Sequence, residues 1–100
     1  MTDSSKFLQL ARELFPVLVQ YVPVVDRVHG DHHPEFHDVR RLYDSIYQKT
    51  SQDFASKPDL YEEFSQLQKI TKDYSVPDDV CETYEAVYNM LKQLNAAYKG

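Results

Sequence analysis

Residues 80–98 read VCETYEAVYNMLKQLNAAY, and this stretch decides the fold class. Apolar side chains recur in it at intervals of four and three residues, which places them on one face of an α-helix. Pro77, Asp78 and Asp79 come just before the repeat, a composition typical of a first helical turn. The stretch therefore predicts an amphipathic helix that begins at Pro77 and has the following core-facing stripe: Val80, Tyr84, Val87, Leu91, Leu94 and Tyr98.

Three further segments show helical periodicity. The first covers residues 5–28, the second runs from about Pro34 to a point before Pro58, and the third covers residues 58–74. Acidic side chains crowd the start of the third segment, where they favour the helix dipole. The predicted core of these three segments consists of Leu14, Val17, Leu18, Tyr21, Phe36, Val39, Tyr43, Ile46, Leu60, Phe64 and Leu67.

The first segment contains two prolines, Pro16 and Pro23, each of which removes a backbone donor, so we expect a kinked helix. Its β-branched run at residues 17–25, VLVQYVPVV, also permits a strand, but strict alternation fails in that run. Gly30 follows as the expected left-handed residue that ends the helix. Four amphipathic helices joined by short loops predict an all-α protein, a short antiparallel up-down four-helix bundle that forms one domain over residues 1–100.

Composition narrows the classes of function. The 100 residues carry a net charge of −5 and no Lys/Arg cluster, which argues against a nucleic-acid partner. No segment approaches the ~20 apolar residues that span a bilayer, and the N-terminus lacks the layout of a signal peptide. Cys81 is the single cysteine and has no intramolecular disulfide partner, so the cytoplasm is the expected compartment.

All four histidines fall within VHGDHHPEFH, residues 28–37. Imidazole is the commonest transition-metal ligand, and His33 and His37 lie four residues apart, a spacing that places both on one helical face. With His29 they form the candidate metal site, which would take iron or zinc. The alternative interpretation is a polar turn whose histidines are solvated or bind backbone groups. No cofactor is expected under that interpretation.

Cys81 has two interpretations. It lies near the predicted start of a helix, a position that lowers a thiol pKa and makes it reactive, or it is a small buried hydrophobic residue. The tyrosines of the last segment are expected to pack in the core. No nucleophile triad, phosphate-binding loop or nucleotide motif is present, so the sequence favours a non-enzymatic role.

Two stretches resemble the di-iron iron–sulfur cluster repair family, whose members have a hemerythrin-like fold. Residues 21–46, YVPVVDRVHGDHHPEFHDVRRLYDSI, resemble a "VHG..HPEL..V..LF..L" pattern, and residues 67–94 resemble "LR.LT.DY.PP..AC.TY.A.Y..L.EL". ELFPVL at residues 13–18 resembles the family's "ELP.L" element. The resemblance implies a hemerythrin-like bundle and a link to repair of clusters damaged by nitric oxide or peroxide.

The family's di-iron ligands are not matched. Leu8 stands where the family has its first-helix histidine, and residues 53–57 replace the "H..KEE..LFP" motif without a histidine. Residues 57–59 replace the "EH...G" motif, and the sequence ends at Gly100, before a "HIHLENN" segment. The resemblance therefore implies a shortened relative that lacks its own di-iron centre.

Three functions follow from these observations. The first is a metal-free relative of the repair family that binds a protein partner or itself, as a homodimer formed through the first or fourth helix, in nitrosative or oxidative stress. The second is an iron- or zinc-binding protein that uses His29, His33 and His37. The third is a repair protein whose di-iron ligands are completed by a partner chain.

Overall fold

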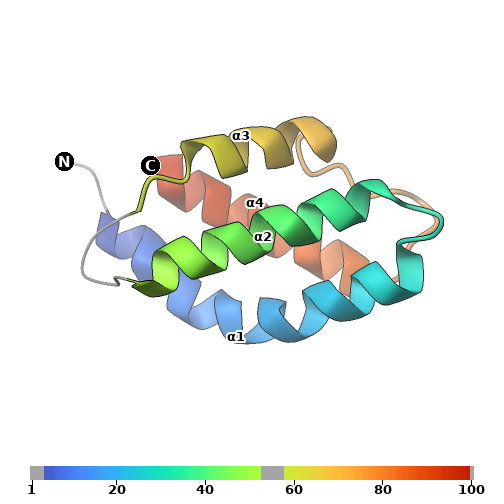
Figure 1. Ribbon diagram of the computed structural model, residues 1–100, viewed down its shortest axis with the longest axis horizontal. Helices are drawn as coiled ribbons and strands as arrows, with labels where there is room; N and C mark the ends of the chain where they lie inside the picture. The colour runs from blue at the N-terminus through green and yellow to red at the C-terminus, as the bar shows by residue number, and fades with distance from the viewer. Residues whose placement is uncertain (1–3, 53–57, 100) are drawn as a thin grey trace.

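The computed structural model describes residues 4–52 and 58–99, which form four α-helices (Figure 1). They are α1 (Ser4–His29), α2 (Glu35–Gln52), α3 (Tyr61–Ile70) and α4 (Glu82–Lys99). Successive helices run in opposite directions, so α1 begins and α4 ends at the same end of the bundle. The predicted all-α antiparallel four-helix bundle is confirmed. No helix among these residues is both long and apolar enough to cross a membrane.

Helix α1 continues through both prolines and bends as it does so, as Figure 1 shows from the change in direction between its two halves. A proline removes one intrahelical bond and pushes the preceding turn aside, so a bend is the expected response of a long helix that still packs along its length. Helix α1 packs most extensively against α4, and α2 packs against α3 and α1.

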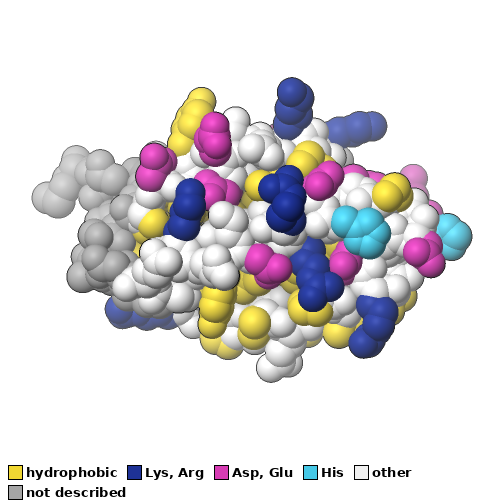
Figure 2. All heavy atoms as spheres, viewed as in Figure 1, with side chains coloured by type: hydrophobic (Ala, Val, Ile, Leu, Met, Phe, Trp, Pro, Cys, Tyr) yellow, Lys and Arg dark blue, Asp and Glu magenta, His cyan; other side chains and the backbone are white. Residues whose placement is uncertain are grey.

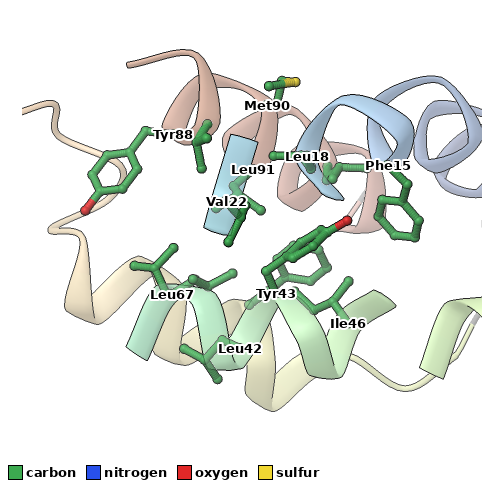
Figure 3. Packing of buried hydrophobic residues seen from close by; sticks show 14 of the residues in the cluster. Phe15, Leu18, Val22, Leu42, Tyr43, Ile46, Leu67, Tyr88, Met90 and Leu91 are labelled. Atoms are coloured by element: carbon green, nitrogen blue, oxygen red, sulfur yellow. The ribbon is translucent and has the colours of Figure 1, made fainter. Parts of the chain in front are cut away.

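The core is formed by side chains from all four helices, which interdigitate as Figure 3 shows. The predicted stripes of the second and fourth helices are buried, with Val80 and Tyr98 only partly so. The predicted core residues of the third helix are buried as well. Of the predicted core residues of the first helix, Leu18 is confirmed, whereas Val17 and Tyr21 are exposed and Leu14 is half-buried. The buried residues of α1 are Phe7, Leu8, Ala11, Phe15, Leu18, Val22 and Val25.

Helix α3 is shorter than predicted at both ends, since it begins at Tyr61 and a left-handed turn ends it after Ile70. Lys72, Asp73 and Tyr74 have φ angles of 53°, 59° and 61°, a region that side-chain-bearing residues enter at a cost. The Thr71 hydroxyl donates to the Leu67 carbonyl and accepts from the Tyr74 amide at 2.8 Å. Asn95 Nδ2 in α4 donates to the buried Tyr74 hydroxyl at 2.9 Å, which anchors the turn in the core.

Two predicted boundaries are also corrected. Helix α4 begins at Glu82 and not at Pro77, because Asp78 and Asp79 form a turn and the Cys81 carbonyl accepts the first helical bond, from the Glu85 amide. Gly30 does not adopt a left-handed conformation. Its missing side chain is required for space, since a Cβ there would collide with the Asp26 carbonyl and lie 2.6 Å from Cε1 of His37.

Candidate functional site

The two stretches that carry the family resemblance meet at one end of the bundle. His29 ends α1, and Cys81 comes directly before α4, 52 positions later in the chain. Nε2 of His29 lies 3.2 Å from Sγ of Cys81, a hydrogen-bonding distance for an imidazole and a thiol. Cys81 is exposed, so its interpretation as a small buried residue is wrong. Figure 2 shows histidine side chains at this end, beside the turn that joins α1 to α2.

His33 joins two loops at the same end. Its Nδ1 atom lies 3.2 Å from Oε2 of Glu35, at the start of α2. Its Nε2 atom lies 3.0 Å from Oδ1 of Asp79, in the loop before α4. With both ring nitrogens engaged and its side chain 14% exposed, His33 holds the α1–α2 turn against the α3–α4 loop.

Tyr84 lies beneath both histidines. Its ring centroid is 5.5 Å from that of His29, 5.6 Å from that of His33 and 5.1 Å from that of Phe36. Its hydroxyl lies 2.9 Å from the Tyr88 hydroxyl, and both side chains are buried. Burial raises the pKa of Tyr84 and of Tyr88 above the ordinary value of 10.0, so both stay neutral at physiological pH. These rings form a packed support under the histidines.

His37 points to a different set of groups. Its Nδ1 atom lies 2.5 Å from Oδ1 of Asp26 in α1, and the other Asp26 oxygen accepts from Arg40 at 3.0 Å. His37 and Arg40 therefore tie α2 to the last turns of α1, over the space left by Gly30. The structure brings His29 and His33 together around Tyr84 and places His37 on the Asp26 carboxylate.

The described residues do not fit a di-iron centre. Leu8, at the position of the family's first ligand, is 6% exposed and packs in the hydrophobic core. The replaced motif at residues 53–57 lies outside the described residues. Within residues 4–52 and 58–99, no group of three or more His, Cys, Asp or Glu side chains is arranged to hold a metal ion.

A second candidate site lies on α1, and sequence reasoning assigned three of its residues, Leu14, Val17 and Tyr21, to the core. Six residues that follow one another at intervals of four and three form a hydrophobic line roughly 100° around the helix from the buried face. We call this line the outer strip: Leu10, Leu14, Val17, Tyr21, Val24 and Val28. Its first two members are half-buried, and the other four are 36–59% exposed, least at Tyr21 and most at Val28.

Further apolar surface lies on the side of α1 away from the strip, because Pro16 and Val19 each follow a strip residue by two positions, roughly 200° around the helix. Val19 is exposed, and a shallow hollow of about 400 Å³ between α1 and α2 is lined by Arg12, Phe15, Pro16, Val19, Tyr47 and Ser51. Figure 2 shows hydrophobic side chains along the lower edge of the molecule, where α1 lies. Exposed apolar surface, on the strip and on this second side of α1, is typical of interaction sites in soluble proteins.

Sequence reasoning missed two features of these sites. The Asp79 partner of His33 was assigned to a helical turn, and no spacing in the sequence connects a loop aspartate to a histidine 46 residues away. Leu14, Val17 and Tyr21 of the outer strip were predicted to face the core together with Leu18, which is the only one of the four that is fully buried. The preceding Phe7, Leu8, Ala11 and Phe15 were the signal that a competing stripe faces the core.

Comparison of the chain with protein-family models, curated proteins and solved structures finds no match.

Proposed function

We propose that this protein is a metal-independent binding protein, a shortened relative of the cluster repair family that acts through the outer strip of α1. The observation that carries the proposal is the exposure of Val17, Tyr21, Val24 and Val28 on a helix whose other repeat, roughly 100° around the helix, already fills the core. A helix that serves only to hold the bundle together needs one hydrophobic face. The second face costs solubility and is explained by a protein that covers it.

The filled interior supports the same proposal. Leu8, at the position where the resemblance implies a ligand, is packed among apolar side chains, and we expect this packing to stabilise the bundle without metal–ligand bonds. The motif resemblance supplies the biological setting, which we propose to be the response to nitrosative or oxidative stress in the cytoplasm. The working surface is then the outside of the bundle and not its interior.

The test combines metal analysis with a matched pair of surface variants. Protein from iron-supplemented cells is expected to contain far less than two irons per chain, without an oxo-bridge absorption band. The variant Val17→Glu/Val24→Glu is expected to lose the proteins that co-isolate with the wild-type chain. The control, Ser65→Glu/Gln66→Glu, adds the same charge on the exposed face of α3 and is expected to retain them. Stoichiometric iron, or equal co-isolation by both variants, would contradict the proposal.

A second candidate is iron or zinc binding by His29, His33 and His37, which requires His37 to leave Asp26, because the described structure does not bring the three imidazoles together. The 3.2 Å approach of His29 to Cys81 favours it, because imidazole and thiolate are zinc ligands and the Cys81 side chain is exposed. If zinc binds there, His33→Ala is expected to abolish binding in a calorimetric titration, and unchanged binding would place the site elsewhere. The di-iron centre completed by a partner chain is tested in the same way, by measuring iron in the isolated complex.

A further inference from the structure

The outer strip has the geometry of one half of a coiled-coil seam. Its members lie at intervals of 4, 3, 4, 3 and 4 residues, which is the spacing of alternating seam positions in a heptad repeat. From residue 10 to residue 28 the strip extends about 27 Å at 1.5 Å per residue. A partner that covers it is therefore expected to present a helix with the same spacing.

The strip is complementary to itself when two copies run antiparallel. The seam has two alternating positions, one occupied by residues 10, 17 and 24 and the other by residues 14, 21 and 28. In an antiparallel pair, a residue at the first position packs against a residue at the second position of the facing helix. A two-fold axis beside residues 19–20 pairs Leu10 with Val28, Leu14 with Val24, and Val17 with Tyr21 of the second copy. The two-fold symmetry makes each of these pairs occur twice, so all six members of each strip gain a hydrophobic partner.

The polar residues that border the strip select the same register. Glu13, Gln20 and Arg27 follow one another at seven-residue intervals along one edge of the strip, and all three are exposed. Around the same two-fold axis, Glu13 of each copy faces Arg27 of the other copy, and Gln20 faces Gln20 of the other copy. A parallel arrangement would bring equal positions of the two copies to the same level and would not pair these opposite charges.

We propose that the protein bound by the outer strip is a second copy of this chain, which docks its own α1 antiparallel in the register of Glu13 with Arg27. This inference rests on the proposed function, since it names the partner of the same surface. The charge complementarity favours a second copy over an unrelated protein, because both halves of each charge pair and of each hydrophobic pair are present in one strip. Pro16 and Pro23 lie outside the strip and contribute no side chain to the seam, which follows the bend of α1.

Charge reversal tests the register. Because of the two-fold symmetry, Glu13→Arg places an Arg opposite Arg27 twice per dimer. Arg27→Glu places a Glu opposite Glu13 twice per dimer. Each single variant is expected to weaken dimerisation by about tenfold in sedimentation velocity at low salt. The double variant Glu13→Arg/Arg27→Glu restores both opposite-charge pairs and is expected to return to within about threefold of the wild type. Circular dichroism checks that all three variants remain helical.

The outcomes separate this inference from the proposed function. Single reversals without effect, or a double variant no better than the singles, would overturn the antiparallel register. A wild-type chain that stays monomeric across the micromolar range, while Val17→Glu/Val24→Glu still loses other co-isolated proteins, would overturn the second copy and leave the proposed function standing. Strip variants that change neither self-association nor co-isolation would overturn both.

Discussion

Helix α1 carries two hydrophobic repeats, and the contrast between them is the main lesson of the molecule. The inner repeat, which includes Ala11, Phe15, Leu18, Val22 and Val25, is buried against the other helices. The outer strip has the same spacing of threes and fours and remains exposed over residues 17–28. The spacing of apolar residues therefore specifies a helix that can pack on two sides, and only the tertiary structure decides which side faces the core.

The largest expected effect is on the inner face. Leu18 is fully buried, so Leu18→Ala removes packed side-chain atoms and leaves a cavity among the surrounding helices. We expect a loss of about 2–5 kcal/mol of unfolding free energy, a large share of the stability of a domain this small. Urea unfolding followed by circular dichroism measures it. A loss as small as that of a surface substitution would contradict the assignment of the two faces.

A second prediction concerns the carboxylate of Glu63, a charged group that is buried in the bundle, whereas the outer strip places apolar residues on the surface. Burial opposes ionisation of Glu63, but hydrogen bonds from Lys49 at 2.7 Å and Ser45 at 2.8 Å outweigh it and lower the pKa of Glu63 below 4.5. A carboxyl whose folded pKa is depressed stabilises the fold above its unfolded pKa. That stabilisation is lost as pH falls through the lower, folded pKa.

Urea midpoints measured from pH 6 downward are therefore expected to decrease as the pH falls below about 4.5, the ordinary value for this carboxyl. The comparison is with Glu63→Gln, which cannot ionise and is expected to show a shallower decrease. Equal slopes for both proteins would show that the Glu63 carboxylate does not contribute to the acid sensitivity of the fold.

A third, smaller effect is expected at Tyr43, whose ring lies 5.9 Å from that of Phe15 on the inner face of α1. Burial raises the pKa of the Tyr43 hydroxyl, and within the described residues this hydroxyl has no hydrogen-bond partner. Tyr43→Phe removes an unsatisfied polar atom and keeps the packed ring, so we expect unchanged stability or a gain of about 1 kcal/mol. Thermal unfolding measures it. A clear loss would indicate that the hydroxyl has a polar partner after all.

The smallest effect is expected on the outer face. Val17 is adjacent to Leu18 in sequence but 37% exposed, so Val17→Ala is expected to change the stability of the monomer by less than about 0.5 kcal/mol. The measurement is made at low protein concentration, where dissociation removes any contribution from the second copy. Equal losses for Val17→Ala and Leu18→Ala would remove the distinction between the two faces.

The sequence was sufficient for the fold and for three of the four core stripes. The stripes of α2 and α4 stand out because polar residues separate them from any competing repeat, as at Tyr84, Leu91 and Leu94. In α1 apolar residues cover most of the circumference between Leu14 and Val28, so two stripes of equal quality compete. The stripe that reaches back to Phe7 and Leu8 buries more aromatic and aliphatic surface, and it faces the core.

The candidate site at the histidine end was only partly predictable. The sequence indicated that His29 and His33 belong to one polar turn, but their partners, Cys81 and Asp79, come from a loop that lies beside this turn only after α1 and α4 have packed. Their approach depends on helix length and register across the bundle, and no local pattern encodes it.

Sedimentation equilibrium of the wild-type chain tests the central claim most directly. The outer strip is proposed to be a binding surface that a second copy covers. The apparent mass is therefore expected to rise with concentration across the micromolar range, from the 11.8 kDa of one chain toward twice that value. The variant Val17→Glu/Val24→Glu, measured in parallel, is expected to remain at the single-chain mass. A wild-type mass that stays near 11.8 kDa at every concentration would contradict the claim.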